Sequence, residues 1–290
     1  MLPLEELERA AVAAGCLTVR EEPMSRHTTF RIGGPADLFV TVCSAEALEL
    51  LVKETQWLQI PLFLLGKGSN LLVSDSGVRG CVACLSGDEI SLSGETEIIC
   101  GSAVSLAGLC NFAKKYELTG LEFAWGIPAS VGGAAYMNAG AYNKDMASVV
   151  TSVTVINPCL EEEILLPENL DFKYRSSFLK EHEDYIVIKA TLKLTKGNKE
   201  EILNLMQDRQ KRRLATQPLE YPNSGSVFRN PKDNYAGSLI ENCHLKNYHI
   251  NDAYISEKHA NFIINKGHAT GKDIVNLIEY IQKEVKEEYN

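Results

Sequence analysis

The chain has 290 residues, which is too long for one small hydrophobic core and predicts two or three domains of about 100 residues each. Its formal net charge is −9, and its lysines and arginines are scattered, so the composition argues against a nucleic-acid-binding surface. Residues 4–12 predict an acidic amphipathic helix rather than a signal peptide, and no run of 18 apolar residues occurs. We therefore expect no membrane span and a cytoplasmic location.

The first third of the chain predicts a helix and strands around a glycine-rich loop. Ser44 is expected to cap a helix that runs through Trp57, and 61–65 is an apolar strand ending at the loop 66–70. Another strand is expected at 71–73. A Rossmann turn needs a third glycine with a helix directly after it, but Leu71 occupies that place, so we exclude this turn. The loop is either a tight turn or a main-chain nest for a pyrophosphate.

The eight cysteines and six histidines show no metal-binding pattern. The cysteines lie in apolar segments of a long chain, as expected of reduced core thiols. Cys81 and Cys84 form a CxxC, but within a predicted strand these positions face opposite sides of the sheet. The histidines lack HxxxH and HExxH spacing. We expect no metal site.

A second glycine-rich segment, 126–142, consists almost entirely of small residues. Ser130 is expected to cap a short helix beginning near Val131. The small side chains either let a flat ring or a phosphate lie against the main chain, or they serve close helix–sheet packing. Strands are predicted nearby at 97–100, 149–156 and 185–194. The two glycine-rich segments together favour a large, phosphate-containing cofactor lying across two α+β lobes.

The C-terminal third changes to a mainly helical pattern after Gly197. Residues 199–213 predict a helix with Ile202, Leu205 and Met206 on one face. A helix from Ala236, a strand at 261–264 and a final amphipathic helix at 271–288 follow, and the final helix is expected to dock on the last domain. The predicted domains are 1–84, 85–197 and 198–290.

The loop 222–231 lies between the first two of these helices and contains a candidate reactive hydroxyl. Prolines at both ends and Gly225 favour a shaped loop that presents its side chains. Ser226 is the residue of interest. Taken alone, the Ser-Gly-Ser tripeptide is more often an ordinary polar turn.

Six ordered segments together carry a family resemblance. They are 27–37 (HTTFRIGGPAD), 65–73 (LGKGSNLLV), 126–142, 174–178 (YRSSF), 222–231 (PNSGSVFRNP) and 256–262 (SEKHANF). In this order and spacing the chain resembles the UDP-N-acetylenolpyruvoylglucosamine reductase family, flavin enzymes that make UDP-N-acetylmuramate for bacterial peptidoglycan. The resemblance implies an α+β chain: a two-subdomain FAD-binding fold of the vanillyl-alcohol-oxidase (PCMH) type, followed by an α+β substrate-binding domain.

The resemblance also implies the ligands and their binding residues. FAD is expected to bind non-covalently, with NADPH as co-substrate and a sugar nucleotide as substrate. The pyrophosphate would lie at Gly66, Gly68, Ser69 and Asn70, and the adenosine and flavin along Ile127, Pro128, Gly132, Gly133 and Asn138. Ala129 replaces a usual glycine, which is tolerable where φ is negative. We expect a monomer or weak oligomer with no nucleic-acid or membrane partner.

The chemistry implied by the resemblance consists of two half-reactions. NADPH reduces FAD, and the enolpyruvyl substrate then takes a hydride at its vinyl methylene carbon. Arg175 would stabilise the charge on the substrate carboxylate, because a guanidinium is permanently charged and planar. Ser226 would donate a proton to the adjacent carbon. Asn230 and His259 match substrate-contacting positions.

Some residues depart from the family pattern. His244 and Asn247 stand where glycines are usual, and Asn251-Asp252 also differs. A catalytic glutamate is expected a few residues beyond the equivalent of Asn290. This position lies outside the 290-residue sequence, which leaves three alternatives open: the native chain is longer, catalysis is impaired, or another acid takes the role of the glutamate.

Two other functions stay open beside the active reductase. One is an FAD- or sugar-nucleotide-binding protein with impaired turnover, and the other is an oxidase of the same flavoprotein superfamily.

Overall fold

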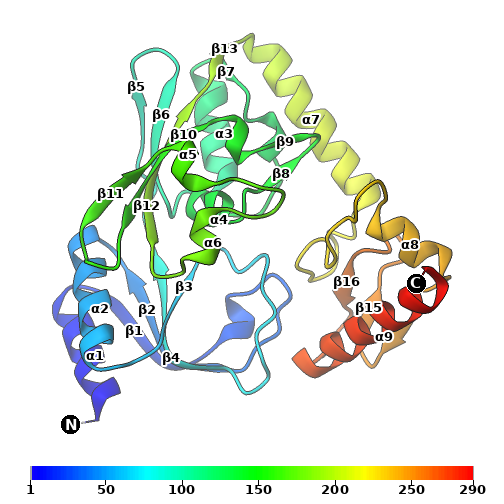
Figure 1. Ribbon diagram of the computed structural model, residues 1–290, viewed down its shortest axis with the longest axis horizontal. Helices are drawn as coiled ribbons and strands as arrows, with labels where there is room; N and C mark the ends of the chain where they lie inside the picture. Colours follow the sequence, from blue (N-terminus) through cyan, green and yellow to red (C-terminus); the bar gives the residue numbers. More distant parts are fainter. Residues whose placement is uncertain (1, 290) are drawn as a thin grey trace. The chain divides into compact units, whose positions relative to one another are not determined.

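The structure, a computed structural model, describes residues 2–289, and the chain divides into two compact units (Figure 1). Unit 1 contains the N-terminal residues as far as Val19 together with Leu38–Lys67 and Gly80–Lys211. Unit 2 contains Arg20–Asp37, Gly68–Arg79 and the chain from Arg212 onward. Two early segments therefore belong with the C-terminal part of the chain. The domain limits 1–84, 85–197 and 198–290 stay a prediction.

The first sheet has four strands in the order β1-β2-β4-β3. Strands β3 and β4 are parallel, with Leu62 opposite Cys81 and Leu65 opposite Cys84. Helices α1 and α2 pack on each other, and their apolar faces share a core with buried side chains of β2 and β4. The elements are α1 (Pro3–Ala13), β1 (Leu17–Pro23), β2 (Pro35–Val42), α2 (Ala45–Trp57), β3 (Leu62–Leu65) and β4 (Val78–Leu85).

The second sheet is antiparallel, with five strands in the order β11-β10-β12-β6-β5. Helices α3 and α4 contribute Leu106, Leu109 and Val131 to the core beneath it. The strands are β5 (Ile90–Ser93), β6 (Glu97–Gly101), β10 (Val150–Ile156), β11 (Glu162–Leu165) and β12 (Ile186–Lys193). The helices are α3 (Leu106–Lys115), α4 (Val131–Tyr136), α5 (Pro167–Leu170) and α6 (Phe178–Glu181).

Short elements complete unit 1 and lead out of it. Two small antiparallel pairs are formed by β7 (Leu118–Thr119) with β13 (Thr195–Lys196) and by β8 (Gly140–Ala141) with β9 (Lys144–Asp145). Single 3-10 turns are η1 (Met24–Arg26) in unit 2, and η2 (Glu122–Ala124) and η3 (Met146–Ser148) in unit 1. The long helix α7 (Lys199–Thr216) begins in unit 1 and ends in unit 2.

Unit 2 is built around a three-stranded antiparallel sheet in the order β14-β15-β16, with α8 and α9 beside it (orange to red in Figure 1). Ile274, Leu277 and Ile281 of α9 are buried against Ile255 and Ile263 of the sheet. The elements are α8 (Ala236–Asn242), β14 (His249–Ile250), β15 (Ala253–Ile255), β16 (Ile263–Asn265) and α9 (Gly271–Tyr289). No helix within residues 2–289 is long and apolar enough to cross a membrane.

The two early segments of unit 2 lie against each other through glycines. Met24 N–H donates to Gly34 O, and Gly34 N–H donates to Ser74 O. A methyl group at Gly34 would collide with the carbonyl of Asp75, and one at Gly68 would collide with the carbonyl of His27. Gly68 also has φ +59, a left-handed conformation that glycine adopts without strain. The close main-chain approach therefore requires glycine at both positions.

Most elements predicted from the sequence are confirmed. Ser44 caps α2 by accepting from Ala47 N, and Ser130 caps α4 by accepting from Gly133 N. The final helix docks its apolar face in the core of unit 2. The match follows from strong local signals, since a capping hydroxyl before a regular apolar repeat leaves little choice of structure.

Three expectations were wrong in detail. Residues 71–73 form no strand: Leu71 and Leu72 line a pocket and Val73 packs in the interior. Leu205 on α7 is 39% exposed, whereas Ile202 and Met206 are buried. The strand predicted at 261–264 begins two residues later, because the Asn261 side chain pairs with another loop.

The beginning of α9 is held by two carboxylates. Asp75 accepts from the N–H groups of Gly271 (2.7 Å) and Lys272 (3.0 Å). Asp273 accepts from the N–H (2.9 Å) and hydroxyl (2.8 Å) of Thr270 and from the Asn251 amide (2.8 Å). Burial on its own raises the pKa of Asp273, but these hydrogen bonds outweigh it and bring the pKa below its ordinary value.

We predict that Asp273→Asn lowers the free energy of unfolding by about 1 kcal/mol at neutral pH, the usual size of a lost helix cap. Because the folded-state pKa is lowered, the contribution is complete above the pKa of an unfolded aspartate, about 3.9, and is lost as pH falls through the folded-state value. Urea unfolding at several pH values measures this. Asp88→Asn, in an exposed loop, is the control; a loss that did not shrink in acid would contradict the prediction.

Candidate functional site

The loop 222–231 is fixed in unit 2 by side-chain amides at both ends. Asn223 accepts from Gly225 N–H (3.0 Å) and donates to Tyr221 O (2.8 Å). Asn230 accepts from Ala236 N–H (3.1 Å) at the beginning of α8. Gly225 has φ +81 with open space around it, so the left-handed turn is the reason for glycine there. The loop is thus an ordered structure.

Ser226 lies exposed on this loop, where it forms an isolated antiparallel bridge with Phe262. Within residues 2–289 its hydroxyl has no hydrogen-bond partner. It lines two adjoining pockets of unit 2. The main chain of the loop therefore presents an available hydroxyl, and the reactive role of Ser226 stays a prediction.

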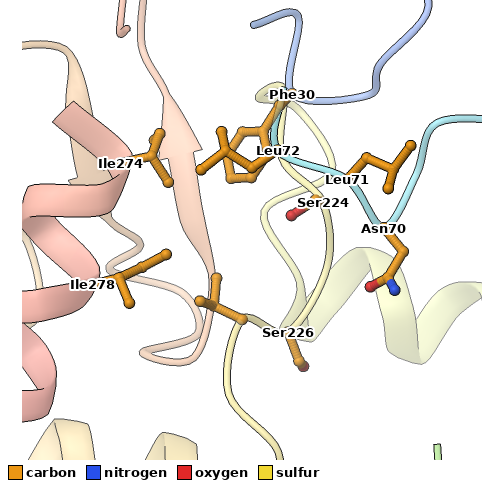
Figure 2. A pocket seen from close by; sticks show the side chains of 9 residues that line it. Phe30, Asn70, Leu71, Leu72, Ser224, Ser226, Ile274 and Ile278 are labelled. Atoms are coloured by element: carbon orange, nitrogen blue, oxygen red, sulfur yellow. The ribbon is translucent and has the colours of Figure 1, made fainter. Parts of the chain in front are cut away.

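The first pocket has a volume of 170 Å³ and combines a polar and an apolar end. Figure 2 shows Ile274 and Ile278 pointing from α9 toward the side where Phe30 and Leu72 lie, while Asn70, Ser224 and Ser226 supply polar groups. The structure thus brings Asn70, predicted to bind FAD, and Ser226, predicted to donate a proton, to one pocket. They are far apart in the sequence.

The second pocket, of 310 Å³, is more polar and is lined by both predicted substrate-binding residues, Asn230 and His259. Sequence reasoning missed the other polar residues of this pocket. They are Tyr235, Ser238, Glu241, Lys258 and Asn261. Lys258 lies in the matched segment 256–262, so the family resemblance could have indicated it as a pocket residue. No sequence pattern around Tyr235 or Glu241 indicates a binding site.

His259 is held as a neutral ring. Its Nδ1 accepts from Asn261 N–H (3.2 Å), so the ring proton lies on Nε2. Burial lowers the pKa of His259, and the positive charge of Lys246 lowers it further. The imidazole is therefore a neutral group in the pocket at pH 7.

Arg175 belongs to unit 1 and is held by main-chain carbonyls. Its Nη2 donates to Gly140 O (2.5 Å) and its Nη1 lies 3.5 Å from Asn138 O, while the guanidinium lies 5.0 Å from the centre of the Tyr174 ring. The residue has φ +55, an unusual conformation for arginine that costs about 1–3 kcal/mol. Such strain fits a side chain placed for a function.

Asn138 has a structural task that the sequence did not reveal. Its amide donates to Asp145 Oδ2 and to Lys173 O, both at 3.0 Å, and accepts from Ala147 N–H at 3.0 Å. The side chain is 2% exposed. Its amide is therefore occupied within the protein, and its main-chain N–H donates to Ala135 O (3.1 Å).

One glycine from each of the two glycine-rich segments, Gly66 and Gly132, serves close packing inside unit 1. A methyl group at Gly66 would lie 2.7 Å from the Ser130 hydroxyl, and one at Gly132 would lie 2.7 Å from Cβ of Ser102. Gly133 N–H donates to the same Ser130 hydroxyl. Both segments therefore meet at Ser130, at the beginning of α4, with Ile127 and Pro128 in the turn just before it.

The donors that a pyrophosphate would need lie in the loop after β3. Gly68 supplies the left-handed turn, and in the described part of the chain the side chains of Ser69 and Asn70 make no hydrogen bonds. This set of neutral donors fits an anion bound by main chain and short polar side chains. Gly66 belongs to unit 1, whereas Gly68, Ser69 and Asn70 belong to unit 2.

The unusual residues of the segment 244–252 keep the main chain that glycine would give. His244, Asn247 and Asn251 have φ +58, +64 and +48, all left-handed. Asparagine tolerates this conformation better than most residues. Asp252 accepts from His268 N–H (2.7 Å). Within residues 2–289, no group of three or more His, Cys, Asp or Glu side chains is arranged to hold a metal ion.

Comparison with known proteins identifies the two parts of the chain. Residues 36–159 match the FAD binding domain family, and residues 217–290 match the family described as UDP-N-acetylenolpyruvoylglucosamine reductase, C-terminal domain. The protein is therefore an FAD-binding oxidoreductase of α+β fold, as the sequence predicted.

The relatives specify the family. The UDP-N-acetylenolpyruvoylglucosamine reductase of Caldanaerobacter subterraneus subsp. tengcongensis is 48% identical, over 92% of this chain and 88% of the relative. That of Anoxybacillus flavithermus is 43% identical, over 99% and 95%. The chain belongs to the UDP-N-acetylenolpyruvoylglucosamine reductase family.

Solved structures agree on the fold. The UDP-N-acetylenolpyruvylglucosamine reductase of Thermus caldophilus superposes with a TM-score of 0.80 at 36% identity, over 93% of this chain and 95% of that one. A variant of Physcomitrella patens BBE-like 1, at 14% identity and a TM-score of 0.50, shares the fold over 66% of this chain and 44% of its own.

We predict that Asn138→Ala destabilises the protein by about 2 kcal/mol more than Asn143→Ala, because it removes the three hydrogen bonds made by a buried amide. Both residues have positive φ, but Asn143 is exposed, so the control carries the conformational cost alone. Urea unfolding of the two variants gives the difference. Equal losses would show that the Asn138 amide contributes little.

Proposed function

We propose that the protein is an NADPH-dependent reductase that converts the enolpyruvyl group of UDP-N-acetylglucosamine-enolpyruvate into the lactyl group of UDP-N-acetylmuramate, in peptidoglycan synthesis in the cytoplasm. Family membership supports the activity, and the available hydroxyl of Ser226 in an ordered, pocket-lining loop is the observation that carries the mechanism. The expected ligands are non-covalent FAD, NADPH and the sugar nucleotide.

FAD fits the residues that the sequence assigned to it. We propose that the loop donors hold the pyrophosphate and that the small-residue segment lines the adenosine and flavin. Asn138 would contribute by holding the shape of this segment, since the residue is 2% exposed and its amide is occupied. The assigned residues are Gly66, Gly68, Ser69, Asn70, Ile127, Pro128, Gly132, Gly133 and Asn138. These residues would hold FAD, and the chemistry that the flavin would supply is the passage of two electrons from NADPH to the vinyl methylene carbon as a hydride.

The protein residues then manage charge and protons. After hydride addition, negative charge develops on the neighbouring carbon and its carboxylate, and the guanidinium of Arg175 stabilises it. Ser226 donates its hydroxyl proton to that carbon, which completes the C–H bond, and the serine recovers a proton from solvent. Asn230 and the Nε2–H of His259 would bind the substrate in the second pocket. The overall reaction consumes one NADPH and one proton.

The direct test is a spectroscopic assay of the purified protein. It should show a flavin absorption spectrum, NADPH should bleach it, and the enolpyruvyl substrate should restore it under anaerobic conditions. Bound flavin without restoration by the substrate would instead indicate a binding protein with impaired turnover. Restoration by a small alcohol-derived carbonyl compound, with no need for a UDP sugar, would indicate another oxidoreductase.

We predict that Ser226→Ala slows flavin reoxidation by the enolpyruvyl substrate roughly 10²- to 10⁴-fold, the usual effect of losing a general acid, and leaves flavin reduction by NADPH unchanged. Stopped-flow absorbance measures the two half-reactions separately. Ser224→Ala, two residues away in the same loop, is the matched control. If both half-reactions of Ser226→Ala slowed equally with flavin still bound, Ser226 would not be the proton donor.

A further inference from the structure

One buried side chain in unit 2 pairs with the main chain of the Ser226 loop. Asn261 accepts from Phe228 N–H through Oδ1 (2.8 Å) and donates from Nδ2 to Phe228 O (2.8 Å). A side-chain amide thus takes the place of a neighbouring β-strand residue, with one bond in each direction. We call this pair of hydrogen bonds the amide clamp.

The main chain of Asn261 extends the same connection. Its carbonyl accepts from Val227 N–H (2.9 Å), and its N–H donates to Nδ1 of His259 (3.2 Å). Phe262, the next residue, forms the bridge with Ser226. One residue therefore connects the loop that presents Ser226 with the ring of His259, and it fixes which nitrogen of that ring carries the proton.

The clamp needs an amide because both hydrogen bonds are made at one buried position. Asn261 is 4% exposed, so a side chain at this position must satisfy both Phe228 groups without help from water of its own. A carboxylate could accept from the N–H but would repel the carbonyl oxygen, and an apolar side chain would satisfy neither. The clamp thus depends on a group that both donates and accepts.

The position of the loop matters for chemistry because serine is a weak acid. Proton transfer from a hydroxyl requires hydrogen-bond distance to the accepting carbon, and a displacement of about 1 Å costs roughly 100-fold in rate. Ser226 precedes the clamped Phe228 by two residues in the chain. The Ser226 hydroxyl makes no hydrogen bond to any of the residues that the structure describes. Its placement is therefore set by the main chain.

We propose that Asn261 is a positioning residue for proton donation: the amide clamp fixes the main chain on which Ser226 stands and so holds the Ser226 hydroxyl at the reacting carbon. This inference rests on the proposed function, because it assigns a role within the second half-reaction. It predicts that the clamp affects flavin reoxidation and leaves flavin reduction by NADPH unaffected.

The test uses Asn261→Asp, since a neutral carboxylic acid has the same donor and acceptor pattern as an amide. Burial raises the pKa of such a carboxyl, so the acid form should prevail at about pH 5.5 and the carboxylate at about pH 8. Single-turnover flavin reoxidation of the flavin-loaded variant should be roughly 10- to 100-fold slower than wild type near pH 8 and approach wild type near pH 5.5.

Controls separate the clamp from other titrations. Wild type is measured at the same pH values, because titratable groups of unit 2 lie around the clamp. They are His259, Glu241, Lys246, Lys258 and Glu220. Asn265→Asp is the matched variant: Asn265 is equally buried, but its amide bonds Phe30, Gly267 and Ala269. Because this amide does not contact the Ser226 loop, the reoxidation rate of Asn265→Asp relative to wild type should be the same near pH 5.5 and near pH 8.

Two outcomes overturn the proposal: a rate for Asn261→Asp equal to wild type at every pH, or a slow rate with no recovery in acid. If the aspartate variant does not fold, Asn261→Ser replaces it; serine cannot span both bonds, so reoxidation should be slow at all pH values, and a wild-type rate would contradict the clamp. If the flavin of the wild-type protein is not reoxidised by the substrate, the proposed function fails.

The amide clamp can then still be tested by hydrogen exchange of the Phe228 N–H. Loss of the clamp in Asn261→Ser should speed that exchange at least about tenfold.

Discussion

The loop that presents Ser226 depends on the pairing of the Asn261 amide with the main chain of Phe228. This pairing joins the loop 222–231 to the segment before β16 without a regular strand on either side. Asn223 and Asn230 hold the two ends of the loop, and Asn261 holds its middle. Three amides thus shape a stretch whose prolines cannot join a sheet. The result is an ordered main chain carrying a hydroxyl that has no partner within residues 2–289, and proton donation requires such an available group.

The same reasoning applies to Arg175 in unit 1. The buried amide of Asn138 connects the segments around β9 and Lys173. The main-chain carbonyl of Asn138 lies beside the guanidinium of Arg175. In both units an internal asparagine supports a neighbouring residue proposed to act on the substrate. Amides suit this task because they satisfy main-chain donors and acceptors at once and carry no charge that needs a counter-ion.

The sequence predicted the regular elements well because their signals are local. The capping residues Ser44 and Ser130 predict where α2 and α4 begin, and the apolar repeat of α9 predicts which face of that helix is buried. Ser226, Asn230 and His259 were predicted through matched motifs, and the structure places them around one pocket. Leu71–Val73 and the role of Asn261 were not predictable, because each depends on a partner distant in sequence. An apolar triplet does not reveal whether a neighbouring strand exists, and an asparagine does not reveal which main chain it meets.

The most direct test of the central claim is a double-mutant cycle of Ser226→Ala and Asn261→Ser, measured as the single-turnover rate of flavin reoxidation by the enolpyruvyl substrate. If Asn261 acts through Ser226, the Asn261→Ser substitution slows the wild-type protein roughly 10- to 100-fold but has almost no further effect once Ser226 is alanine. If the two effects multiply in the double variant, Asn261 acts independently of Ser226, and the account is contradicted.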